Sequence, residues 1–146
     1  MDNMALPTKI QLQIVSADRS LVNETVDEVE IPGADGYFGV LPGHTPLLGL
    51  LGAGELWYRQ GPGDANTHYL SIAFGFAEVQ PDRVTILAQI AEKADEIDIA
   101  RAEQAKKRAE ERVRSYAVDM DAERARIALL KSLIRLQVAS RVRMRS

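Results

Sequence analysis

Glycine and proline stop abruptly part-way along this chain of 146 residues. All ten glycines lie at or before Gly75, and all six prolines lie at or before Pro81. These residues build the turns between strands and interrupt helices, so a chain of short connected strands needs them throughout. The later residues are mainly Ala, Glu, Lys, Arg and Leu, which favour helices. The sequence therefore predicts a β domain over residues 1–90 and a helical domain over residues 91–146.

The first part has the alternating pattern of half-buried strands. Ile10, Leu12 and Ile14 alternate with polar residues, and residues 28–31 repeat the pattern. Further runs rich in β-branched or aromatic residues lie at 56–58, 69–74 and 84–87. Turn-forming residues separate the runs at 32–36, 61–66 and 81–82. This spacing is typical of an antiparallel sandwich or barrel, and we expect the glycine-rich stretch 52–56 to be a hairpin turn.

The second part has the periodicity of two helices. Ala102, Ala105, Ala109, Val113 and Tyr116 recur at helical spacing. A second apolar stripe contains Ala122, Ala125, Leu129, Leu133 and Leu136, widened by Leu130, Ile134 and Val138. We expect Asp95 to cap the first helix, a break at 115–122, and Asp119 or Asp121 to cap the second. Two helices of about 20 residues bury little surface, so an antiparallel hairpin is a candidate moving part.

The net charge of −3 conceals a strong asymmetry. Residues 1–94 carry a net charge of −7 and residues 95–146 a net charge of +4, with seven basic residues and no acid after Glu123. A basic second helix can bind an acidic partner, such as nucleic acid, anionic lipid or an acidic protein surface, or it can simply be solvated. Nucleic acid is the weaker choice, because no aromatic residues accompany the charge.

No catalytic constellation is visible in the sequence. The chain has no cysteine, which excludes thiolate nucleophiles, disulfides and thiolate metal sites. His44 lies in the segment GVLPGHTPLL, where neighbouring Pro42 and Gly43 favour a structural turn over a chemical site. We predict no catalytic residue and no metal site. No apolar run approaches the roughly 20 residues of a membrane span, and residues 1–8 lack the pattern of a signal peptide.

One segment of the first helix deserves a separate hypothesis. Asp98 and Arg101 in IDIARA are three residues apart and share a helix face. With Lys131 and Arg135 on the facing helix, four charged groups can converge on an anion. The alternative is an intrahelical ion pair, which physical reasoning alone favours.

Taken together, these segments resemble the epsilon subunit of bacterial F-type ATP synthases over nearly the whole chain. The matching stretches are GxxGVLPGHTPLL at 36–48, FAEVQPDRVTILA at 76–88, DEIDIARAEQAKKRAEER at 95–112 and RLQVA at 135–139. The resemblance implies an α+β fold: an N-terminal antiparallel β-sandwich of about ten strands, followed by a C-terminal two-helix hairpin.

The resemblance also implies a non-catalytic rotor component that joins the gamma subunit to the c-ring and needs no cofactor. The implied location is the cytoplasmic side of the bacterial inner membrane, peripherally and without direct insertion. The hairpin would extend towards the alpha and beta subunits and inhibit ATP hydrolysis, its basic helix meeting an acidic part of beta. The implied ring-contact loop contains Gly33, Asp35, Gly36, Tyr37, Phe38 and Gly39.

Some members of this family bind regulatory ATP on the folded hairpin through an I/L-D-x-x-R-A motif. Ile97, Asp98, Arg101 and Ala102 match this motif fully. Further positions that the resemblance assigns to ATP are Glu92, Arg124, Lys131 and Arg135. Lys131 replaces an arginine of the ATP-binding members and lacks the planar group that grips phosphate at two points. ATP sensing and a basic-helix adaptor therefore remain alternatives to the rotor function.

Overall fold

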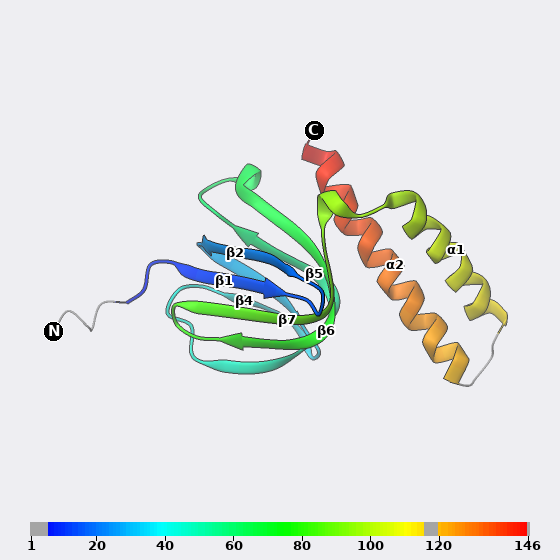
Figure 1. Ribbon diagram of the computed structural model, residues 1–146, viewed down its shortest axis with the longest axis horizontal. Coiled ribbons are helices and arrows are strands. Elements are labelled where there is room, and N and C mark those ends of the chain that lie inside the picture. Colours follow the sequence, from blue (N-terminus) through cyan, green and yellow to red (C-terminus); the bar gives the residue numbers. More distant parts are fainter. Residues whose placement is uncertain (1–5, 116–119, 146) are drawn as a thin grey trace.

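The computed structural model describes residues 6–115 and 120–145 and contains a curved sheet with two helices beside it (Figure 1). The strands are β1 (Ile10–Val15), β2 (Ser20–Val26), β3 (Glu28–Gly33), β4 (Gly36–Val40), β5 (Leu47–Arg59), β6 (Thr67–Val79) and β7 (Arg83–Lys93). The helices are α1 (Ile99–Ser115) and α2 (Met120–Arg145), with short 3-10 helices η2 (Asp64–Asn66) and η3 (Ala94–Glu96). This order confirms a β domain followed by a helical hairpin.

The seven strands form one sheet in the order β2-β1-β7-β6-β5-β3-β4, curled around a single core. Neighbouring strands are antiparallel, with one exception: β1 and β7 run parallel. The expected all-antiparallel sandwich therefore needs correction at this pair. A parallel pair requires a long crossover, and here the connection consists of five intervening strands.

Strands β5, β6 and β7 bend together at one line across the sheet. Gly52, Phe74 and Gln89 are the residues at which the β5–β6 and β6–β7 registers skip a pair. Phe74 has a φ of 65° and Gly75 a φ of 116°, so the bend in β6 requires left-handed backbone. The expected strand count of about ten is therefore wrong: the sheet has seven strands, because the three long strands continue through the bend instead of ending at it.

The prediction that the stretch 52–56 is a hairpin turn is wrong, because these residues form the middle of β5. Its glycines permit close approach instead of a chain reversal. A Cβ on Gly52 would lie 3.0 Å from the carbonyl oxygen of Gly33, and one on Gly54 would lie 2.7 Å from Cβ of Pro32. Glycine therefore marks the crossing of β5 with the β3–β4 hairpin here.

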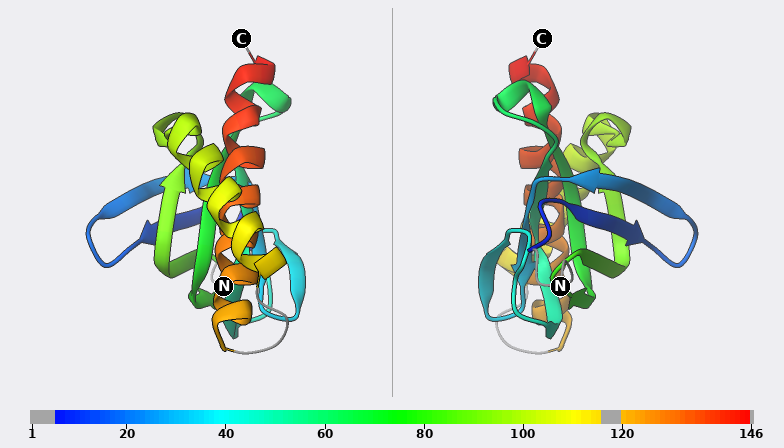
Figure 2. Two further views of the ribbon diagram at one scale, coloured as in Figure 1. Left: turned by 90° about the vertical axis from the view of Figure 1, so that its right-hand side faces the viewer. Right: turned by 90° about the vertical axis from the view of Figure 1, so that its left-hand side faces the viewer.

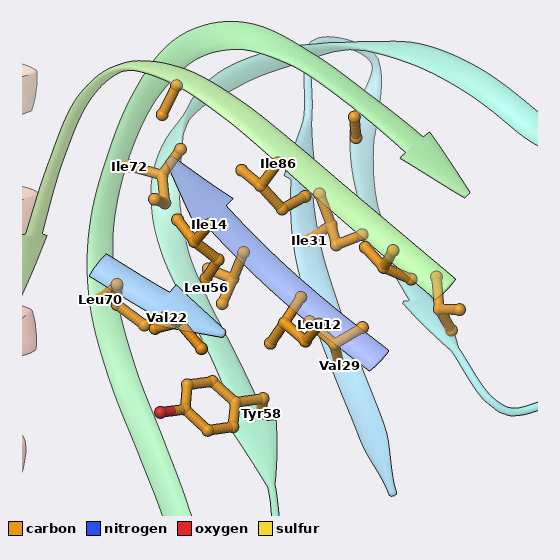
Figure 3. Close-up of a cluster of buried hydrophobic side chains, with 14 of the residues drawn as sticks. Leu12, Ile14, Val22, Val29, Ile31, Leu56, Tyr58, Leu70, Ile72 and Ile86 are labelled. Atoms are coloured by element: carbon orange, nitrogen blue, oxygen red, sulfur yellow. The ribbon is translucent and has the colours of Figure 1, made fainter. Parts of the chain in front are cut away.

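The core of the sheet follows the predicted alternation. Ile10, Leu12 and Ile14 are fully buried, and Figure 3 shows the last two of them among side chains from several curved strands. The twenty buried residues of this cluster all lie between Ile10 and Ala91. A separate, smaller cluster joins the hairpin to the sheet and contains Ile97, Val138 and Ala139. The β domain thus has a core that does not depend on the helices.

The hairpin lies on one side of the sheet, with α2 between the sheet and α1 (Figures 1 and 2). Small residues on both helices are buried: Ala102 and Ala109 on α1, Ala122 and Ala125 on α2. The stripe expected on α2 is therefore confirmed at Ala122, Ala125 and Val138 and is wrong at Leu130 and Leu133, which remain 45% and 44% exposed. Alanine packing brings the two helix backbones close, and Val138 and Ala139 then face the sheet side of α2.

The prediction that Asp95 caps α1 is wrong. Asp95 lies in η3, and the Oδ1 atom of Asp98 accepts a hydrogen bond from the backbone N–H of Arg101 at 3.1 Å. This is the geometry of an N-cap one residue before Ile99. Asp121 lies inside α2, whereas Asp119 and half of the expected break, residues 116–119, fall outside the described residues. Within the described ranges, neither helix has the length and apolar character of a membrane span.

Candidate functional site

The interface between α2 and the sheet carries the main polar contacts of the hairpin. Two arginines of α2, Arg135 and Arg141, reach carboxylates on the outer face of the sheet. Arg135 pairs with Glu92 near the end of β7, and Arg141 pairs with Glu55 in β5. The two pairs are six residues apart on α2, about 9 Å along the helix axis. They hold one helix to the sheet at two points.

Glu55 is the most buried acid at this interface, with 7% of its surface exposed. Arg141 donates from Nε and Nη2 to its two oxygens, each at 2.9 Å, and Gln137 donates to Oε1 at 3.4 Å. The guanidinium also lies over the ring of Tyr69, 5.0 Å from its centroid. The hydrogen bonds to Glu55 raise the pKa of Arg141. A buried carboxylate needs such a partner, since an unpaired charge there is strongly unfavourable.

The structure brings together three of the residues assigned to ATP. Glu92, Lys131 and Arg135 line a cavity of about 280 Å³ between the hairpin and the sheet, together with Ser132 and Ala105. Arg135 is engaged by Glu92, while Lys131 Nζ lies 5.4 Å from the centroid of the Phe74 ring. The cavity thus offers two cations, one of which is already paired with a carboxylate.

The other residues of that hypothesis lie apart from this cavity or have structural contacts. Asp98 caps α1, Arg101 is exposed, and Ala102 is buried. Ile97 belongs to the cluster around Val138. The exposed Arg124 precedes Arg135 by eleven residues, which places it about 16 Å away along α2. Asp98 and Arg101, the charged residues of IDIARA, are not among the described residues that line this cavity.

The loop assigned to the c-ring lies at the tip of the β3–β4 hairpin. Gly33 pairs with Gly36, which has a φ of 135°, so the reversal is tight. Asp35, Gly36, Tyr37 and Gly39 are exposed, and Phe38 packs against the edge of the core. The Tyr37 hydroxyl accepts a hydrogen bond from the backbone N–H of Glu55 at 3.0 Å. The loop is thereby connected to the strand that holds α2.

Pro42, Gly43 and His44 lie in the connection between β4 and β5. Gly43 has a φ of 86°, and its N–H donates to the Pro81 carbonyl at 2.7 Å. The His44 N–H donates to the Leu41 carbonyl at 3.1 Å, and Nδ1 donates to the Thr45 carbonyl at 2.7 Å. All of these contacts of His44 are with local backbone, and the described residues contain no group of acids and histidines arranged to hold a metal.

A second cavity, of about 510 Å³, lies beside the last turns of α2. Its lining includes Tyr58, His68, Glu24 and Arg141. The rings of Tyr58 and His68 stack with their centroids 5.0 Å apart, and the Tyr58 hydroxyl donates to Glu24 at 3.3 Å. Burial, reinforced by the nearby carboxylate of Glu24, raises the pKa of Tyr58.

A row of exposed apolar residues lies on the outer face of the sheet, on the side of the bend away from the hairpin. Leu50, Phe76 and Leu87 are direct neighbours on β5, β6 and β7, and they are 60%, 51% and 51% exposed. Leu48 lies on the same face of β5 as Leu50 and extends the row with 71% exposure. A continuous exposed apolar surface of this kind marks a place where another molecule binds.

Sequence reasoning missed Glu55, Arg141 and Tyr69 at the hairpin interface and the apolar row. The available signal for Glu55 is its position as a single acid within a long apolar stretch of β5. The row was hidden because the bend reverses the inward and outward faces along each strand. In β5 the buried hydrophobic residue before the bend is the odd-numbered Leu51, whereas those after the bend are the even-numbered Leu56 and Tyr58.

Comparison with known proteins agrees with this architecture. Residues 9–94 match the family described as ATP synthase, Delta/Epsilon chain, beta-sandwich domain, and residues 95–140 match its long alpha-helix domain. The ATP synthase epsilon chain of Solibacter usitatus is 43% identical over 136 residues, which cover 93% of this chain and 99% of the relative. That of Herpetosiphon aurantiacus is 48% identical over 130 residues, covering 89% and 93%.

Solved structures lead to the same class. A chain of the Euglena gracilis mitochondrial ATP synthase, in its OSCP/F1/c-ring assembly, superimposes with a TM-score of 0.78 at 26% identity, covering 93% of this chain and 84% of that one. A chain of the Tetrahymena thermophila central stalk and c-ring has the same fold, with a TM-score of 0.62 at 12% identity. The architecture is that of a β-sandwich with an attached helical hairpin. This chain belongs to the epsilon-chain family of ATP synthase subunits.

Proposed function

We propose that this chain is a non-catalytic rotor subunit of a bacterial ATP synthase, located peripherally on the cytoplasmic side of the inner membrane. In this proposal the β domain joins the gamma subunit to the c-ring, so that ion flow through the membrane sector is coupled to ATP synthesis. The hairpin acts separately, by extending towards the alpha and beta subunits and restraining ATP hydrolysis. The functional division falls near residue 90.

The exposed row of Leu50, Phe76 and Leu87 is the observation that carries the proposal. The bend in β5, β6 and β7 separates this row from the part of the sheet on which the hairpin docks. The row therefore stays accessible while the hairpin is docked. Its apolar character suits a permanent subunit contact, which buries more apolar surface than a transient one. We assign this row to gamma, and the β3–β4 tip, whose exposed residues include Tyr37, to the c-ring.

The assignment is tested by binding of the full chain to purified gamma subunit. Phe76→Asp places a charge in the centre of the row, and we expect at least about a tenfold loss of affinity, as for a central interface residue. Leu133→Ser is the matched control, since it removes a 44% exposed leucine from α2. Unchanged binding by Phe76→Asp, with an intact circular dichroism spectrum, would refute the assignment to gamma.

The inhibitory role is tested on an ATP synthase from which this subunit has been removed. Adding back the full chain should lower the rate of ATP hydrolysis. Neutralising the exposed cations Arg124 and Arg126 should weaken this effect without releasing the chain from gamma. Two of the other cations, Arg135 and Arg141, are paired with the β domain when the hairpin is docked. Docking therefore reduces the number of α2 cations that a nucleic acid could reach.

ATP binding is a second candidate function, favoured by the cavity that contains Lys131 and Arg135. A phosphate group entering it would be attracted by both cations and would compete with Glu92 for Arg135. Calorimetric titration of the full chain with ATP tests the site. Lys131→Arg should increase the affinity because arginine adds a two-point contact. Absence of binding at millimolar ATP by both proteins would exclude the site.

A further inference from the structure

We propose that Tyr37 couples the β3–β4 tip to the docking of α2, through Glu55 and Arg141. The inference rests on the proposed function for its biological meaning, since it links the surface assigned to the c-ring with the mobile hairpin. The physical coupling itself concerns only contacts within this chain. It makes the ring-side loop a control element for the hairpin.

The first step is the irregular pairing of β3 with β5. Glu30 pairs with Trp57 and Gly33 pairs with Leu51, so only Ile31 and Pro32 stand opposite the five residues 52–56. Glu55 lies within this interruption, where β3 provides no regular partner for its N–H. The Tyr37 hydroxyl accepts the hydrogen bond from Glu55 instead, at 3.0 Å.

The second step is the close seating of the Tyr37 ring. A Cβ placed on Gly54 would lie 3.0 Å from Cζ of Tyr37 and nearer still to its hydroxyl. The ring therefore occupies the space that a side chain at position 54 would need. Tyr37 is nevertheless 56% exposed, so a molecule bound at the β3–β4 tip can reach it. The residue is both accessible from outside and in contact with the backbone of β5.

The third step is the carboxylate of Glu55. Arg141 binds both of its oxygens, and Gln137 adds a longer contact. Because two-point pairing needs a fixed direction of the acceptor, rotation of the Glu55 backbone disturbs the contact with Arg141. Loss of the Tyr37 hydrogen bond leaves the backbone at this position paired only on its β6 side, where Glu55 stands opposite Ser71. The docked state of α2 then loses one of its two ion pairs.

Thermodynamic reciprocity makes the proposal specific. If the position of Tyr37 changes the fraction of docked α2, then docking of α2 must change the stability of the Tyr37 contact by the same factor. A partner that binds the β3–β4 tip and moves Tyr37 favours release of the hairpin. A partner that binds more tightly when Tyr37 is seated favours docking.

Hydrogen exchange of the full chain tests the coupling. Tyr37→Phe keeps the ring and removes the hydroxyl, and we expect amide exchange in residues 132–142 to accelerate about fivefold, the effect of one hydrogen bond. Glu55→Gln should accelerate it at least about tenfold, because it leaves Arg141 without a charged partner. Tyr58→Phe is the matched control: it removes a tyrosine hydroxyl from β5 that bonds to Glu24.

A double-mutant cycle decides between coupling and independent effects. In the Arg141→Gln background the contact with Glu55 is already lost, so Tyr37→Phe should add almost nothing to the exchange of α2. Additive effects would overturn the proposal, as would unchanged exchange in Tyr37→Phe. Acceleration spread equally over β1 and β7 would also overturn it, because it would indicate a general loss of stability. None of these outcomes bears on the gamma-binding test, so the two proposals fail separately.

Discussion

Arg135 of α2 and Glu92 of β7 form a two-point ion pair across 43 residues of sequence, with donor–acceptor distances of 2.6 and 3.1 Å. The two side chains are 21% and 26% exposed, so water screens the pair only in part. Arg135 is also one of the two cations in the smaller cavity. The same guanidinium thus binds the hairpin to the sheet and would attract an anion that enters the cavity.

We predict that Glu92→Gln weakens docking of α2 by about 1–2 kcal/mol, because a neutral amide replaces one charge of a hydrogen-bonded pair. Amide exchange of α2 in the full chain measures the change. Glu123→Gln is the control, since the Glu123–Arg126 pair lies within α2 and is largely exposed. Equal effects of the two substitutions would mean that the Glu92 pair contributes no more than a surface contact.

Gly54→Ala should destabilise the β domain by about 1–3 kcal/mol, the usual effect of an added methyl group in a filled space. The new Cβ would collide with Pro32 and displace the ring of Tyr37. Gly49→Ala is the matched control in the same strand, because a Cβ there has nothing within 4 Å. Urea unfolding measures both variants. A Gly54→Ala protein as stable as Gly49→Ala would contradict the described seating of Tyr37.

Asp98→Ala should lower the helicity of α1 and cost about 1 kcal/mol, because the N–H of Arg101 loses its acceptor. Asp98→Ser should retain most of the stability, since serine also caps helices. Circular dichroism and amide exchange in residues 99–104 report the effect. The pair of variants also separates capping from nucleotide binding: a role in binding ATP would show as lost affinity in Asp98→Ser despite an intact helix.

The ion pair of Arg19 with Glu96 predicts a pH-dependent contribution to stability. Hydrogen bonds from Arg19 lower the pKa of Glu96 below that of an ordinary carboxyl. Because the folded-state pKa is the lower one, the pair stabilises the folded state above the unfolded-state pKa, about 4.3 for glutamate. This contribution is lost as the pH falls through the lowered folded-state pKa.

Arg19→Met should therefore slightly reduce the free energy of unfolding at pH 7, because both side chains are more than a third exposed and water screens the pair. The difference from the original chain should shrink towards zero in acid, at a pH where Glu96 is protonated in the folded state as well. Arg83→Met, at the exposed start of β7, is the control. Urea unfolding at both pH values provides the measurement, and a difference that persists unchanged in acid would contradict the assignment to Glu96.

The sequence predicted the parts of the fold that depend on local pattern. The alternation at Ile10, Leu12 and Ile14 predicted their burial, and the end of glycine and proline predicted the change from strands to helices. The bend at Gly52 was not predictable in the same way. Glycine permits both a turn and a close crossing, and only the neighbouring strand decides which of the two occurs.

The hairpin interface was predicted only in part. Lys131 and Arg135 do share a cavity with Glu92, as the resemblance implied, but Asp98 and Arg124 lie elsewhere. Helical spacing places residues on a face of their own helix, yet it does not say how far one helix slides along its neighbour. Glu55 and Arg141, 86 residues apart, have no local pattern that connects them.

The connector between the β domain and the hairpin sets a limit on every motion described above. Strand β7 ends at Lys93 and α1 begins at Ile99, with five residues between them. A fully extended connector of this length spans about 20 Å from Lys93 to Ile99. The first turn of α1 therefore stays within this distance of the end of β7, in every position of the hairpin. A partner farther away can be contacted only by the distal ends of the helices. The length of the helices, and not the length of the connector, therefore limits how far from the β domain this protein can bind.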